Sequence, residues 1–268
     1  MANFLVRVLT AVVALPLVGL LVLWQRRLGF GVFVLLVAGL ALCEYVTITL
    51  RANPLPQRAG VVATGIGLSA ALYFWPGLAL LWVSAAVVLV SALVLAAPGP
   101  IEVASARLGV AGFGVFYLGV LTAPLALLQR DVAAGPLWVF VAIAVTFAND
   151  TGAYLAGRAL GRHKLYPAIS PSKTVEGWFG GLLGGVGLMF LARATFFPAL
   201  TLNDCLLVAV PAAFLGPAGD LVESMLKRAA GVKDSGRLVP GHGGILDRID
   251  ALLFVGCWVY AYAAYLRA

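Results

Sequence analysis

The side chains best suited to metal chemistry gather near the C-terminal end of the chain. At 100° per residue, one helix face from residue 220 to 227 presents two carboxylates, a hydroxyl and an ammonium within an arc of about 100°. These are Asp220, Glu223, Ser224 and Lys227. Further on, Asp247 and Asp250 lie one helical turn apart. Carboxylates without thiols favour a hard cation such as Mg²⁺. We therefore predict that Asp220, Asp247 and Asp250 surround a divalent cation.

The alternatives for these carboxylates are structural. The face that begins at Asp220 could form only its own salt bridges three and four residues apart. Asp247 and Asp250 could only complement the positive end of a helix. One acidic residue suffices for that second role, so the pair together with Asp220 favours the cation.

A glycine-rich stretch precedes Asp247. Gly241, Gly243 and Gly244 permit a tight bend whose N–H groups turn inward, which suits phosphate oxygens. His242 lies among these glycines and is weak evidence by itself. Six basic residues of this part of the chain suit a polyphosphate: Lys173, Lys227, Arg228, Lys233, Arg237 and Arg248.

Two earlier segments carry polar residues at or near predicted spans. Asp150 belongs to a polar stripe that either lines a working site or holds helices together. In 170–177, Pro171 ends one element and a Ser or Thr begins a helix with Glu176 in its first turn. Lys173 and the free N–H groups there could seat a phosphate, or the segment could be a simple helix cap. We expect His163 to be solvated.

These residues must be positioned by a membrane protein. Of the 268 residues, 62% are hydrophobic and 11% are charged, against about 25% charged in a soluble protein. We predict an all-α, polytopic fold with about nine spans of about 20 residues each. The predicted spans are 4–24, 29–50, 59–75, 78–97, 109–128, 137–157, 175–197, 205–226 and 247–266. The glycines at 177, 181 and 185 predict close packing of a neighbouring helix.

Loop charge predicts the orientation. Thirteen Lys and Arg residues fall on one side of these spans: Arg7, Arg51, Arg58, Arg107, Arg158, Arg162, Lys164, Lys173, Lys227, Arg228, Lys233, Arg237 and Arg248. Five fall on the other: Arg26, Arg27, Arg130, Arg193 and Arg267. The richer side is cytoplasmic by the positive-inside rule, so the N-terminus faces the cytoplasm. The net charge of +7 then reflects attraction to anionic lipid, and we predict no nucleic-acid partner.

The acidic residues divide the chain into two parts. Eight of the eleven acidic residues and both histidines follow residue 147. We predict a scaffold of membrane helices over 1–135 and a catalytic part over 136–268. The three cysteines have no metal-binding spacing and are interpreted as small apolar residues.

The stretch from Ser224 to Asp250 resembles the signature of the phosphatidate cytidylyltransferase (CDP-diacylglycerol synthase) family of bacterial type. The matching residues are Ser224, Lys227-Arg228, Lys233-Asp234, His242-Gly243-Gly244 and Asp247-Arg248-Ile249-Asp250. The segments 149–154 and 170–177 are similar to two further motifs of that family. Ser172 departs from it, because many members carry a lysine there.

The resemblance implies a homodimeric multi-pass enzyme of the cytoplasmic membrane with its active site facing the cytoplasm. It also implies Mg²⁺-dependent transfer of a cytidylyl group from CTP to phosphatidic acid, with a second cation as an option. Asp220, Asp247 and Asp250 would bind the metal, and Lys227 would join them in catalysis. The remaining predicted contacts to substrate are Asp150, Lys173, Glu176, Glu223, Ser224, Arg228, Lys233, Asp234, His242, Gly243, Gly244 and Arg248.

Other functions stay open at this point. A transporter or channel would use Glu44 and Asp150 as a path for its substrate, but no inverted repeat is visible. A CTP-using polyprenol kinase would release CDP in place of pyrophosphate. A purely structural membrane scaffold would not need so many polar residues.

Overall fold

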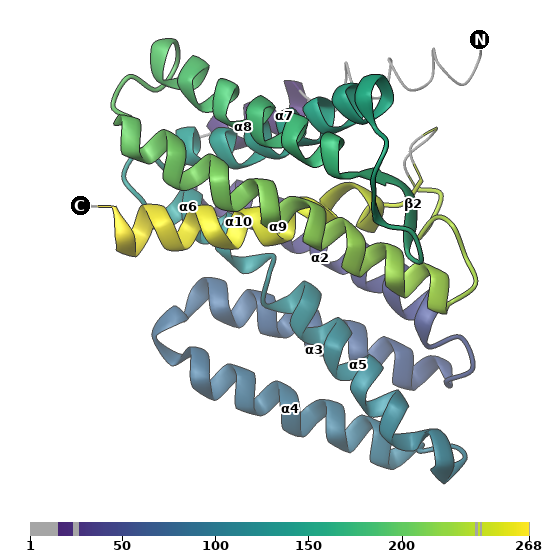
Figure 1. The fold of residues 1–268 in the computed structure, drawn as a ribbon. Coiled ribbons are helices and arrows are strands. Elements are labelled where there is room, and N and C mark those ends of the chain that lie inside the picture. Colours follow the sequence, from purple (N-terminus) through teal and green to yellow (C-terminus); the bar gives the residue numbers. More distant parts are fainter. Residues whose placement is uncertain (1–15, 24–26, 239–240, 242, 268) are drawn as a thin grey trace. The chain divides into compact units, whose positions relative to one another are not determined.

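The computed structural model describes residues 16–23, 27–238, 241 and 243–267. Helices account for nearly all of its regular structure (Figure 1), which agrees with the predicted all-α fold. By internal contacts the chain forms two compact units. The first unit comprises 1–127 and 229–247, and the second comprises 128–228 and 248–268. The glycine-rich loop therefore belongs with the N-terminal helices, whereas the predicted functional division at residue 135 stays a prediction.

The first unit is built from α2 (Arg27–Thr49), α3 (Leu55–Phe74), α4 (Ala79–Ala96) and α5 (Ala104–Gly119). Short 3₁₀ turns, η1 (Pro76–Leu78) and η2 (Ile101–Val103), connect them. Helix α3 contacts the other three helices. Its buried face includes Leu68 and Leu72. Many side chains of α4 are exposed and apolar, as expected for a surface that faces lipid.

The second unit is centred on α7 (Gly135–Leu160) and α8 (Val175–Ala194), which contact each other along their length. A Cβ atom added to Gly181 would overlap Asn149 of α7, and one added to Gly184 would overlap the carbonyl of Ala148. Only glycine therefore permits this approach, and the packing role predicted from the four-residue spacing is confirmed.

Helix α9 (Leu202–Ala229) contains two prolines and stays continuous because its neighbours replace the missing hydrogen bonds. Pro211 and Pro217 lack the N–H groups that an ideal helix would direct at the carbonyls of Leu207 and Ala213. The indole N–H of Trp258 donates to Leu207 at 2.9 Å, and that of Trp178 donates to Ala213 at 2.7 Å. Within a bilayer such carbonyls must be satisfied by protein.

The remaining elements are α6 (Ala123–Asp131), α10 (Leu246–Ala261), η3 (Tyr262–Leu266) and a short hairpin. Strands β1 (Lys164–Tyr166) and β2 (Ser170–Thr174) pair antiparallel, with Lys164 opposite Thr174. The sequence predicts a loop for this segment. The strands are too short and too polar to show an alternating pattern.

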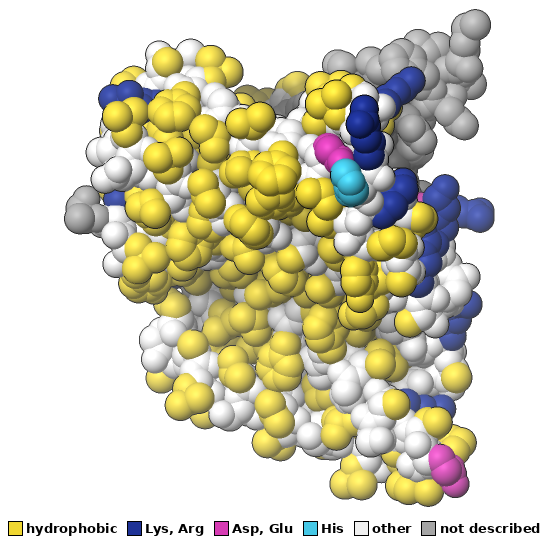
Figure 2. Space-filling view, viewed as in Figure 1, with side chains coloured by type: hydrophobic (Ala, Val, Ile, Leu, Met, Phe, Trp, Pro, Cys, Tyr) yellow, Lys and Arg dark blue, Asp and Glu magenta, His cyan; other side chains and the backbone are white. Residues whose placement is uncertain are grey.

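Seven helices among the described residues are long and apolar enough to cross a membrane. They are Leu28–Thr49, Pro76–Ala96, Ile101–Asp131, Gly135–Leu160, Val175–Ala194, Leu202–Ala229 and Leu246–Leu266. The predicted span 59–75 is helical in α3 but is not among the seven. The predicted span 4–24 lies largely outside the described residues. The visible surface is mostly hydrophobic (Figure 2), so the chain is a multi-pass membrane protein, and a count of nine stays a prediction.

Candidate functional site

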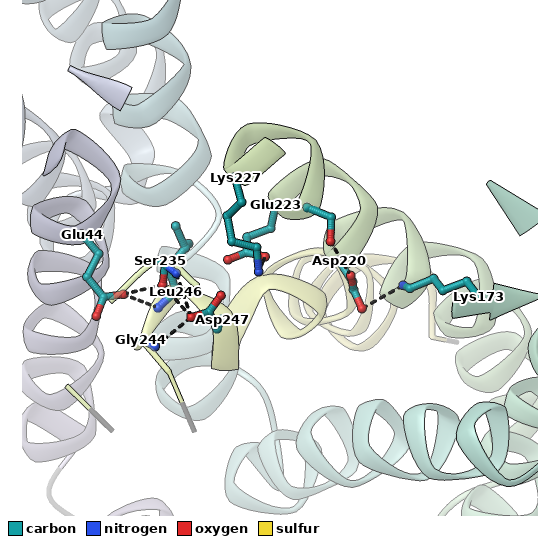
Figure 3. Close-up of polar contacts among 10 residues, drawn as sticks. Glu44, Lys173, Asp220, Glu223, Lys227, Ser235, Gly244, Leu246 and Asp247 are labelled. Atoms are coloured by element: carbon teal, nitrogen blue, oxygen red, sulfur yellow. Dashed lines mark hydrogen bonds and ion pairs between the residues drawn. The ribbon is translucent and has the colours of Figure 1, made fainter. Parts of the chain in front are cut away.

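The second unit contains an α9 cluster, defined as Lys173, Asp220, Glu223, Ser224 and Lys227. The Lys173 ammonium lies 2.8 Å from Asp220 Oδ2, and the Ser224 hydroxyl donates to Asp220 Oδ1 at 3.2 Å. Lys227 forms an ion pair with Glu223, whose carboxylate is only 1% exposed. Figure 3 shows Lys173 reaching Asp220 from β2. The predicted shared face of α9 is confirmed. One salt bridge of its alternative role forms within the face, between Glu223 and Lys227, whereas Asp220 pairs with Lys173 of β2.

The hairpin and the first turn of α8 fix the position of Lys173. The Thr174 side chain accepts a hydrogen bond from Gly177 N at 3.1 Å, which is the predicted helix cap. Glu176 accepts from the backbone N–H of Arg162 at 3.1 Å and lies 2.6 Å from His163 Nδ1. The predicted exposure of His163 is confirmed, and its ring also forms a hydrogen bond with Glu176 that the sequence did not predict.

Asp150 and Asp250 lie close enough to Asp220 to interact with it electrostatically. Asp250 is repelled by Asp220 and Asp150, and Lys227 attracts it. Asp150 is repelled by Asp220 and attracted by Lys173 and Arg248. The second unit thus brings together three of the predicted carboxylates with compensating cations.

The first unit contains a loop cluster, defined as Glu44, Ser235, Gly244 and Asp247. Asp247 Oδ2 accepts hydrogen bonds from Ser235 N at 3.0 Å and from Gly244 N at 2.7 Å. The Ser235 hydroxyl lies 2.9 Å from the same oxygen. Gly243 has a φ of +83°, a conformation that side chains rarely adopt. The predicted tight bend is confirmed.

The backbone donors of this bend differ from the prediction. The N–H of Gly244 donates to Asp247, and that of Leu246 donates to Glu44 (Figure 3). The N–H of Ile245 also donates to Glu44. These three N–H groups therefore bind carboxylates of the protein itself, in place of a phosphate. The bend forms because the chain supplies its own anions to the start of α10.

Four other predicted residues are exposed: Arg228, Lys233, Asp234 and Arg248. His242 lies outside the described residues. Among the described residues, no group of three or more His, Cys, Asp or Glu side chains is arranged to hold a metal ion. The joining of Asp247 to Asp220 and Asp250 around one metal stays a prediction.

Two residues of the loop cluster, Glu44 and Ser235, received no role in the predicted transferase site. Ser235 carried no signal of its own. Glu44 did carry a signal in the sequence, because it is the one acidic residue of the otherwise apolar helix α2. A charged residue within a span is costly and marks a function or a partner.

The fold and these clusters define an all-α, multi-pass membrane protein whose polar groups suit the binding of anionic phosphates. The chain belongs to the cytidylyltransferase family, whose family model matches residues 5–266.

Curated relatives that carry the name phosphatidate cytidylyltransferase match part of the chain. The protein of Staphylococcus haemolyticus is 50% identical over 120 residues, which cover 44% of this chain and 45% of the relative. That of Staphylococcus saprophyticus is 48% identical over 130 residues, 48% of this chain and 49% of the relative. That of Staphylococcus epidermidis is 46% identical over 121 residues, 45% of this chain and 46% of the relative. The chain thus spans about half the length of the curated relatives it matches.

Proposed function

We propose that this protein transfers the cytidylyl group of CTP to phosphatidic acid, forming CDP-diacylglycerol and releasing pyrophosphate. The observation that carries the proposal is the family match across 5–266. The names of the relatives supply the substrates, and the α9 cluster supplies side chains suited to them. A transporter has no comparable support, because the family match describes a transferase.

The reaction joins two anions. A phosphate oxygen of phosphatidic acid attacks the α-phosphorus of CTP, the new P–O bond forms, and the bond from the α-phosphorus to the bridging oxygen breaks. Pyrophosphate leaves with that bond's electron pair. The attacking oxygen is already largely ionised at neutral pH, so no strong general base is required. The protein must instead neutralise charge and align the two phosphates.

The basic residues of the α9 cluster suit this role. Lys173 is held by Asp220 at 2.8 Å, and Lys227 is held by Glu223. A carboxylate thus orients each ammonium, and the ammonium can also donate to an incoming phosphate. Arg228, Lys233 and Arg248 are exposed and would neutralise further phosphate charge.

Mg²⁺ fits the donors of the second unit. Asp220 and Asp250 repel one another, and a divalent cation would relieve that repulsion. Mg²⁺ usually takes one or two protein carboxylates together with substrate phosphates, so a three-carboxylate cage is not needed. When bound, the ion would polarise the triphosphate and stabilise the leaving group. The family resemblance also assigns Asp247 to the Mg²⁺ ion, and it allows a second cation.

The membrane setting of the proposal follows from loop charge and from the resemblance. We infer that the N-terminus and the active site face the cytoplasm, because the basic loops do so under the positive-inside rule. The acyl chains of phosphatidic acid can then stay in lipid while its head group meets the polar residues. A homodimer in the cytoplasmic membrane is expected from the resemblance.

The proposal is tested with purified protein in detergent, supplied with CTP and phosphatidic acid in the presence and absence of Mg²⁺. We expect CDP-diacylglycerol and pyrophosphate in equal amounts, with no product after chelation. Release of CDP together with a phosphorylated lipid would identify a lipid kinase instead. Turnover with Asp220→Asn equal to that of the unaltered protein would contradict the role given to the α9 cluster.

A further inference from the structure

Glu44 is a carboxylate placed where the membrane disfavours it. It lies in α2, within the candidate span Leu28–Thr49, and is 6% exposed. A charge at such a position is retained when it has partners that compensate for its desolvation. Its partners therefore show what it does.

Both oxygens of Glu44 bind the segment that leads into α10. Oε1 accepts from the N–H of Ile245 at 3.0 Å, and Oε2 accepts from that of Leu246 at 2.9 Å. The Ser235 hydroxyl lies 2.9 Å from Oε2. Leu246 is the first residue of α10, so these N–H groups belong to the helix end that has no acceptor of its own. The negative charge also complements the positive end of the helix.

Two glycines let the loop lie directly against this carboxylate. A Cβ atom added to Gly236 or to Gly244 would overlap the Glu44 side chain. A side chain at either position would push the loop away from α2. The glycines and Glu44 together therefore define the position of the loop within the first unit.

The same loop holds Asp247. Ser235 N and Gly244 N donate to Asp247 Oδ2 at 3.0 and 2.7 Å. The Ser235 hydroxyl lies 2.9 Å from both Glu44 Oε2 and Asp247 Oδ2. It therefore lies between the two carboxylates and can donate its one hydrogen to either of them. Displacement of the loop would remove these donors from Asp247.

We propose that Glu44 is a positioning residue for Asp247: from α2 it fixes the segments 235–236 and 244–246, which in turn aim the Asp247 carboxylate. The inference rests on the proposed function, in which Asp247 serves the metal and the nucleotide. Glu44 itself contacts neither substrate nor metal in this account. Partners that orient a metal ligand commonly change metal affinity or activity by about 10–100-fold when removed.

The test compares Glu44→Gln with Glu102→Gln, a control in the exposed turn η2 of the same unit. The amide keeps the shape of Glu44 but presents an NH₂ group to N–H donors. We expect Glu44→Gln to raise the Mg²⁺ concentration for half-maximal activity about 10-fold or more. The KM for phosphatidic acid should not change, and Glu102→Gln should behave as the unaltered protein.

A second readout needs neither metal nor turnover. Arg237 is exposed in the loop and offers a trypsin site. We expect cleavage after Arg237 to be about 10-fold faster in Glu44→Gln, because the loop loses a charged acceptor. This measurement tests whether Glu44 fixes the loop even if the protein proves to catalyse another reaction. Absence of CDP-diacylglycerol synthesis by the unaltered protein would refute the proposed function alone.

Two results would overturn the inference. One is an unchanged Mg²⁺ requirement in Glu44→Gln. The other is a loss confined to protein yield or thermal stability, with normal kinetics in the protein that folds. If Glu44→Gln does not fold, Ser235→Ala removes only the hydroxyl that lies between the two carboxylates. It should raise the Mg²⁺ requirement about 3–10-fold, and an unchanged requirement there would equally overturn the inference.

Discussion

The pairing of indole N–H groups with carbonyls opposite prolines predicts a specific stability effect in α9. Trp178→Phe removes the donor that lies 2.7 Å from the carbonyl of Ala213. Ala213 is 1% exposed, so its carbonyl would be left buried without that bond. An unsatisfied buried group costs about 1–3 kcal/mol. At about 2–4 °C per kcal/mol, the thermal midpoint should fall by about 2–12 °C.

Part of that loss would come from packing, because the Trp178 ring lies 4.8 Å from those of Phe214 and Phe179. Pro217→Ala separates the two contributions. Alanine at 217 supplies the helical N–H that proline lacks, so the carbonyl of Ala213 no longer depends on Trp178. In that background, the cost of Trp178→Phe should shrink by about 1–3 kcal/mol.

The assay is thermal unfolding of the four proteins in one detergent, followed by intrinsic fluorescence and by the fraction that stays monodisperse. The same cost for Trp178→Phe in both backgrounds would refute the reasoning, because the hydrogen bond would then contribute nothing. Trp258→Phe with Pro211→Ala forms an independent second cycle, since Trp258 donates to Leu207 at 2.9 Å.

Three further predictions concern packing and charge. Gly181→Ala should lower the free energy of unfolding by about 1–3 kcal/mol, because the new Cβ atom would overlap Asn149. Gly187→Ala in the same helix meets nothing within 4 Å and should be neutral or slightly stabilising. Equal thermal midpoints for the two variants would contradict the close α7–α8 packing. Lys227→Met should lower the free energy of unfolding by about 3–5 kcal/mol, because it removes the ammonium that pairs with Glu223. Adding Glu223→Gln to this variant should restore stability but not turnover. Full turnover of the double variant would exclude Lys227 from catalysis. Asp247→Asn should abolish synthesis of CDP-diacylglycerol while the protein still inserts into membranes, and near-normal synthesis would remove Asp247 from the site.

Sequence patterns predicted the features that depend on neighbours along the chain. Long apolar runs predicted the spans, because each is set by local hydropathy. The spacing of Gly177, Gly181 and Gly185 predicted close packing of a neighbouring helix, which the structure identifies as α7. The carboxylates and hydroxyl of α9 followed from the helical period. The cap at Thr174 followed from Pro171 and from the acidic residue in the next turn.

Features that depend on distant partners were not predicted. Glu44 is separated by 191 residues from Ser235 and by 202 from Leu246, and no local pattern connects them. The phosphate nest expected at Gly241, Gly243 and Gly244 stays a prediction; the N–H of Gly244 donates to Asp247, and those of Ile245 and Leu246 donate to Glu44. The donation from Trp178 to a carbonyl opposite a proline likewise depends on which helices become neighbours.

The central claim is that the α-phosphorus of CTP is transferred to phosphatidic acid. It is tested most directly by supplying purified protein with Mg²⁺, phosphatidic acid and CTP labelled separately at its α- and γ-phosphates. We expect the α-label to enter the lipid fraction and the γ-label to appear in pyrophosphate, in equal amounts. Appearance of the γ-label in lipid, or of both labels in water-soluble products alone, would contradict it.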